Sequence, residues 1–202
     1  MTSLPIVNTY LSNLSLKIRS KSVAWEGYQR ANLLSAEDVT LIQRVTGQKA
    51  QAESILAAET ETYASLYIRL LNKLSRADTV QSLLSLISDM LADHDERISL
   101  FLALPDSPYT PLLKLLDSQD DFVRLKSTVL TSTFLASDSK PSDQVVSKLL
   151  FHLSGLIRNN SDPEGQDVGV QCLEGILAVE KVRKAVWAAE DKESDAPKIT
   201  EG

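Results

Sequence analysis

The side chains that could do chemistry in this 202-residue chain are few and widely separated. The two histidines, His94 and His152, are far apart in the sequence, and Cys172 is the only cysteine. A metal site or a catalytic cysteine-histidine pair needs several such ligands at short, regular spacing. Phosphate-binding glycine loops, dinucleotide fingerprints, zinc-protease helices and glycine-flanked serines are not found in the sequence either. We therefore predict no catalytic residues, no cofactor and no metal ligands.

The adjacent carboxylates Asp120 and Asp121 could act as a general acid and a general base. They lie, however, where a helix is predicted to begin, and an aspartate there accepts backbone N–H groups and complements the helix dipole. We therefore interpret them as capping residues. His94 is interpreted as a solvated turn residue, and His152 as a half-buried helix residue whose ring has a partner.

The elements that position these residues are predicted to be helices. The segment from Thr110 to Leu130 has the pattern of a helix, a tight acidic turn and a second helix, each with one apolar stripe. Such pairs are stable only when stacked on similar pairs. Phe134-Leu135-Ala136 recurs as Ile176-Leu177-Ala178 at a spacing of 42 residues, within the roughly 40–47 residues of armadillo and HEAT repeats. We predict an all-α, armadillo/HEAT-like helical-repeat solenoid, a right-handed superhelix of stacked helix pairs.

The repeat array is predicted to span residues 1–189 and to be incomplete, with a polar, disordered tail at 190–202. Residues 48–60, which are rich in alanine and glutamate, are interpreted as a loop. Core positions are predicted at Leu130, Leu153 and Trp187. Helix starts are predicted after Ser3 and Pro5, at Ser35 with Asp38, at Asp78 with Gln81, and at Thr110.

Composition and charge exclude several classes of partner. The net charge of −6 gives no general attraction to nucleic acid or anionic lipid. No uncharged apolar run approaches the roughly 18 residues that span a bilayer, and Met1 to Pro5 lack the features of a secretory signal. A lone cysteine fits a reducing compartment. We expect a cytoplasmic protein with no nucleic-acid partner, no direct membrane insertion and no small-molecule substrate.

The opening helix is the candidate partner-binding element. Leu11, Leu14 and Ile18 lie in line on one face of an amphipathic helix. Such a face is suited to a helical partner. The alternative is that these residues pack on the first repeat of the same chain.

Several groups of residues together carry a resemblance to a known family. They are Trp25–Tyr28 with Leu34–Asp38, Leu70–Leu74 with Asp78–Gln81 and Leu86–Leu91, Pro111–Leu116 with Gln119–Phe122, and Cys172–Leu177 with Arg183 and Trp187. In their order and spacing they resemble the N-terminal part of the H subunit of the vacuolar-type proton ATPase (V-ATPase). The resemblance covers nearly the whole chain to Trp187.

The resemblance implies a non-catalytic regulatory component of a proton pump. In this family the protein binds the soluble catalytic sector and the peripheral stalk on the cytosolic face of the vacuolar membrane, and it helps couple ATP hydrolysis to proton transport. The family has a longer array followed by a C-terminal regulatory domain, and from the resemblance we expect this chain to lack that domain. Residues 48–60 and the end after Glu190 also depart from the family pattern. A role in silencing the detached ATPase sector therefore does not follow from the resemblance.

Two other classes of protein remain open from the sequence. The first is a generic armadillo or HEAT adaptor that holds peptides in a groove, which would co-purify with soluble cargo instead of pump subunits. The second is a small all-helical enzyme, which would need a polar pocket with a perturbed titratable group.

Overall fold

The computed structural model describes residues 6–46 and 49–194, with the backbone alone at 49–50 and 188–194. Every regular element in these ranges is an α-helix, which confirms the predicted all-α class. The helices are α1 Thr9–Arg19, α2 Trp25–Arg30, α3 Ala36–Val45, α4 Lys49–Ala58, α5 Thr60–Lys73, α6 Ala77–Leu91, α7 Glu96–Leu102, α8 Tyr109–Leu115, α9 Asp121–Ser137, α10 Asp143–Arg158, α11 Pro163–Ile176 and α12 Glu180–Ser194.

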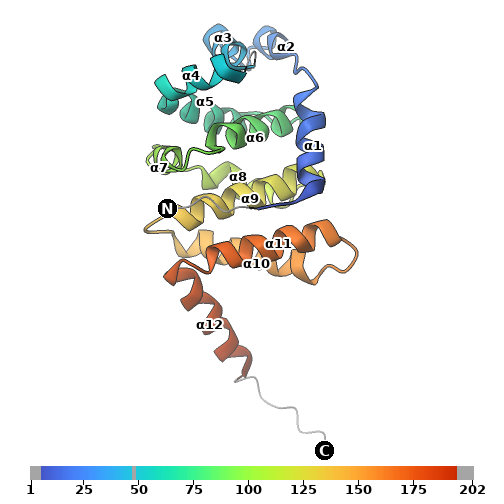
Figure 1. Ribbon diagram of the computed structural model, residues 1–202, viewed down its shortest axis with the longest axis vertical. Helices are drawn as coiled ribbons and strands as arrows, with labels where there is room; N and C mark the ends of the chain where they lie inside the picture. Colours follow the sequence, from blue (N-terminus) through green and yellow to red (C-terminus); the bar gives the residue numbers. More distant parts are fainter. Residues whose placement is uncertain (1–5, 47–48, 195–202) are drawn as a thin grey trace, which may run out of the picture.

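The helices stack in layers along the long axis of the molecule (Figure 1). Helix α5 packs with α6, α8 with α9, and α10 with α11, and α9 joins the layers on either side of it. Helix α1 runs across this stack along one edge, and α12 leaves its end (Figure 1). The stacked pairs confirm the predicted helical-repeat solenoid.

A continuous apolar core runs through the stack. Tyr63 and Tyr67 of α5 have ring centroids 5.9 Å apart, and Phe101 and Phe134 join α7 to α9 with centroids 5.4 Å apart. The predicted core positions on α9 and α10 are confirmed, because Leu130 is 3% exposed and Leu153 is 0% exposed.

Local capping fixes several helix starts. The capping box at α3 is confirmed: Ser35 Oγ accepts the N–H of Asp38, and Asp38 Oδ2 accepts the N–H of Ser35, both at 3.0 Å. Asp120 Oδ1 accepts the N–H of Val123 at 2.9 Å, which confirms the interpretation of this carboxylate as a cap. These side chains satisfy N–H groups that the first turn of a helix leaves unpaired.

Three predicted helix starts are wrong. Ser3 and Pro5 lie outside the described residues, and α1 begins only at Thr9, because the side chain of Asn8 accepts the N–H of Leu11 and caps the helix there. The cap position of α6 is Arg76, and Gln81 instead donates to Asp120 Oδ2 at 2.8 Å, so it joins α6 to the start of α9. Helix α8 begins one residue before Thr110.

Two further predictions are wrong for reasons of packing. Most of residues 48–60 form α4, because alanine, glutamate and leucine favour helix and Leu56 is buried in the core. Trp187 is 65% exposed, since α12 packs on the stack through other residues, including the fully buried Val182. The boundary expected at residue 190 falls inside α12, and residues 195–202 lie outside the described residues.

The capping aspartate Asp38 also makes an ion pair, which predicts a pH-dependent stability. Arg69 Nη2 lies 2.6 Å from Asp38 Oδ1. This hydrogen bond, helped by the Ser35 N–H, lowers the pKa of Asp38 from 3.8 to about 2. Because the pKa is lower in the folded state, the stabilisation is present above pH 3.8 and is lost as the pH falls towards 2.

We expect Asp38→Asn to lower the free energy of unfolding by about 2 kcal/mol at neutral pH and by much less near about pH 2. Denaturant titrations of both proteins at the two pH values measure this difference. Asp78→Asn is the matched control, because Asp78 pairs with an arginine at an exposed position and should contribute less. An equal effect of Asp38→Asn at both pH values would contradict a stabilising role of the ionised Asp38 carboxylate.

Candidate functional site

The most distinctive surface element is α1, which we call the strap helix. It packs against α6 and α9, although about 60 and 100 residues of chain separate it from them. Its N-terminal end reaches α11 through hydrogen bonds. The strap helix therefore joins three successive layers of the solenoid along one edge (Figure 1).

Polar contacts hold the strap helix at both ends. At its N-terminal end, the backbone of Val7 exchanges two hydrogen bonds with the side chain of Gln171, at 2.9 and 3.1 Å. Asn8 Nδ2 donates to two carboxylates of α11, to Asp167 Oδ2 at 2.7 Å and to Glu164 Oε2 at 3.2 Å. At the other end, Arg19 forms a bidentate pair with Asp89 of α6, with Nε 2.9 Å from Oδ2.

The inward face of the strap helix belongs to the core of the chain. Leu11 and Ser15 are each 5% exposed and Ile18 is 8% exposed, whereas Leu14 is half-buried and Leu16 points outward at 64% exposure. Two of the three predicted partner-binding residues are thus covered by the chain's own helices. The amphipathic pattern identified the apolar face but carried no information about what covers it. A role of this helix in binding a partner stays a prediction.

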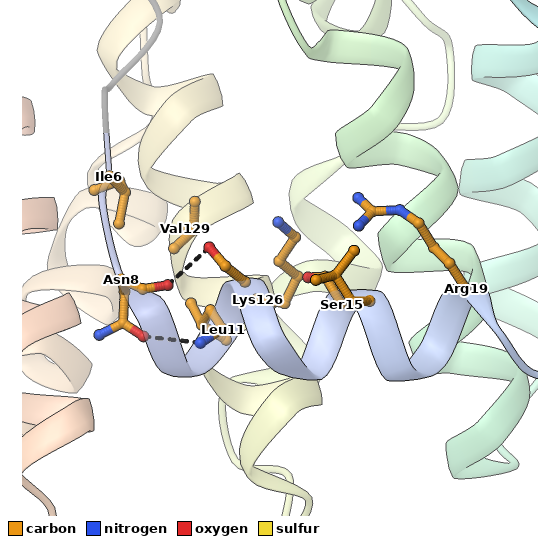
Figure 2. A pocket seen from close by; sticks show the side chains of 9 residues that line it. Ile6, Asn8, Leu11, Ser15, Arg19, Lys126 and Val129 are labelled. Carbon is orange, nitrogen blue, oxygen red and sulfur yellow. Dashed lines mark hydrogen bonds between the residues drawn. The ribbon is translucent and has the colours of Figure 1, made fainter. Parts of the chain in front are cut away.

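A cavity of about 310 Å³ lies between the strap helix and α9. Lys126 and Val129 of α9 line it together with Ser15 and Arg19 of the strap helix (Figure 2). We call this space the strap cavity. Sequence reasoning missed it because no local pattern links Lys126 to residues more than 100 positions earlier in the chain.

Two side chains, His152 and Cys172, are held in their neutral forms by burial. Burial lowers the pKa of His152 to about 4, and its Nε2 lies 2.9 Å from Thr128 Oγ1. The interpretation of His152 as a half-buried residue with a satisfied ring is therefore confirmed. Burial raises the pKa of the Cys172 thiol to about 12, so this thiol stays protonated at neutral pH.

His94 lies in the turn between α6 and α7 as predicted, but its ring is only partly exposed and has two carboxylate partners. Its ring nitrogens lie 3.1 Å from Glu53 of α4 and 2.9 Å from Glu96 of α7, and its side chain is 32% exposed. Arg97 also pairs with Glu53, and this contact lowers the pKa of that carboxyl. No pattern in the sequence indicated this cluster, since Glu53 lies in the segment interpreted as a loop. The described residues contain no grouping of His, Cys, Asp and Glu that could hold a metal.

The stacked helix pairs and the strap helix define a helical-repeat protein whose chief feature is an extended surface. In residues 6–46 and 49–194 we find no helix with the length and apolar character to cross a bilayer. The chain belongs to the family of the V-ATPase H subunit, because the model of the N-terminal part of that family matches residues 9–196. This match includes the strap helix and every layer of the stack.

Named relatives agree with the family match. The chain is 27% identical to the H subunit of the V-type proton ATPase of Drosophila melanogaster over 181 residues, 87% of this chain and 38% of that protein. It is 21% identical to the corresponding protein of Dictyostelium discoideum over 172 residues, 82% of this chain and 38% of the relative. The chain therefore spans about two fifths of the length of these curated relatives.

Proposed function

We propose that this chain is a non-catalytic regulatory subunit of the vacuolar proton-translocating ATPase. It binds the soluble catalytic sector and the peripheral stalk at the cytosolic face of the vacuolar membrane, and it helps couple ATP hydrolysis to proton transport. The family match over residues 9–196 is the observation that carries this proposal. The roles of three titratable residues support it: Asp120 caps a helix, His152 is hydrogen-bonded to Thr128, and Arg97 forms an ion pair.

The strap helix is the proposed contact with a helical partner. Leu11 and Ile18 fix the helix on the stack, Leu14 packs in part against the same core, and the exposed Leu16 points outward. An exposed leucine beside a rigid helix surface is a suitable anchor for the apolar face of a partner helix. We therefore place the proposed contact on the outer side of the strap helix and not on the face of Leu11, Leu14 and Ile18 that the sequence predicted, because this inner face holds the helix on the stack.

We expect Leu16→Glu to weaken binding of the purified chain to the peripheral-stalk pair of the pump by about tenfold, because it places a charge in an apolar contact. Biolayer interferometry measures the affinity, and circular dichroism should be unchanged. The matched control is Leu100→Glu: Leu100 is 38% exposed on α7, at the opposite edge of the stack.

Equal binding by Leu16→Glu and Leu100→Glu would contradict the strap helix as the contact. A chain that ignores the stalk pair but binds soluble peptides would instead favour a generic armadillo or HEAT adaptor. Measurable ATP hydrolysis by the chain alone would contradict the non-catalytic role.

A further inference from the structure

The strap cavity contains a positive charge that the described part of the chain does not neutralise by contact. Lys126 lies on α9 beneath the strap helix, and within residues 6–46 and 49–194 its ammonium group has no hydrogen bond or ion-pair partner. Burial, helped by the charge of Arg19, lowers the pKa of Lys126, while Asp89 opposes this effect. Lys126 is half-buried, and a partly desolvated cation without a direct partner is less favourable than one in water, a cost that a bound anion would relieve.

Two other donors face the same cavity. Ser15 is only 5% exposed, and among the described residues its hydroxyl has no hydrogen-bond partner. Arg19 uses Nε and Nη2 in its pair with Asp89, so its Nη1 hydrogens remain available. Figure 2 shows Lys126 and Arg19 reaching to the same side of the strap helix, with Ser15 between them.

The balance of charge in the cavity is positive. The charge of Asp89 acts on Lys126, but the bidentate pair with Arg19 already offsets this charge. The charge of Lys126 remains. The cavity is also larger than a small ion, and the apolar side chains of Leu16 and Val129 form part of its wall. This combination favours an oxyanion that has several acceptor oxygens and that is free or attached to a small organic group.

We propose that the strap cavity is a binding site for a phosphate group, in which the Lys126 ammonium, the Ser15 hydroxyl and the Arg19 guanidinium donate to the phosphate oxygens. The ammonium, the hydroxyl and the free Nη1 hydrogens of the guanidinium together offer more donors than the two oxygens of a carboxylate accept, which favours an anion with more acceptor oxygens. Because the donors belong to α1 and α9, a bound phosphate would join the strap helix to the stack. This site is independent of the proposed role in the proton pump.

The test uses the purified chain at constant ionic strength, with inorganic phosphate as the probe and isothermal titration calorimetry as the readout. We expect saturable phosphate binding, and Lys126→Met should weaken it by about tenfold or more because it removes a charge-assisted hydrogen bond. Lys114→Met is the matched control, since Lys114 is exposed on α8 outside the cavity, and it should bind as the unmodified chain does.

Ser15→Ala is a second variant, which keeps the packing of the strap helix and should weaken phosphate binding several-fold. It tests the site even if the Lys126→Met variant fails to fold. Hydrogen exchange gives a second readout: phosphate should slow exchange of the amides of residues 9–19. Tighter binding of glycerol phosphate than of inorganic phosphate would identify a phosphorylated organic ligand, whereas equal binding would identify free phosphate.

Three results would overturn the proposal. The first is the absence of saturable phosphate binding by the unmodified chain. The second is an equal affinity of the Lys126→Met and Lys114→Met variants, which would place any bound anion elsewhere. The third is acetate binding as tightly as phosphate, which would show a site without preference for a tetrahedral anion.

Discussion

Replacing Leu153 by alanine is expected to lower the free energy of unfolding by about 2–5 kcal/mol. Leu153 is a fully buried residue of α10, and α10 packs against both α9 and α11. Truncation removes apolar contacts and leaves a cavity that stacked helices can close only in part. Chemical denaturation monitored by circular dichroism measures the loss.

Phe151→Ala is the matched control on the same helix. Phe151 is larger than Leu153 and lies only two positions away, but it is 83% exposed. Its removal should change stability by no more than about 0.5 kcal/mol. If the two substitutions lower the free energy of unfolding equally, this result would contradict the orientation of α10 in the stack. A small effect at both positions would contradict the packed core itself.

The second large effect is expected at the inner face of the strap helix. Ile18→Glu places a carboxylate at a position that is 8% exposed, and a buried charge without a partner is strongly unfavourable. The strap helix can avoid this cost by leaving the stack, so the loss should approach the free energy that holds the helix there. We expect about 3 kcal/mol, together with faster hydrogen exchange at residues 9–19.

Leu16→Glu is the control for this experiment, because it introduces the same carboxylate two residues away at a 64% exposed position. It should leave both stability and exchange nearly unchanged. Unchanged exchange in Ile18→Glu would show that Ile18 is free to meet a partner, as the sequence alone also allowed. The pair of variants therefore separates a structural role of the strap helix from a binding role.

The sequence by itself determined the class of the fold, because helix formation depends on near neighbours. Apolar residues at three- and four-residue spacing mark which segments coil, and a short polar side chain such as Ser35 or Asp120 caps the next turn. The order of these segments was also sufficient to indicate the family. The errors at 48–60 and at Thr110 concern segments whose helical state depends on packing or on weak local signals.

Only the tertiary structure decided which surfaces are covered and which polar groups meet. Leu11 and Ile18 are buried because α6 and α9 lie beneath them, whereas Trp187 is exposed because α12 turns it away from the stack. Glu53 meets His94 across two helices, and Lys126 lies beneath the strap helix. These contacts join residues far apart in the chain. An amphipathic stripe specifies that a face must be covered, but the identity of the covering element depends on how all the helices pack together.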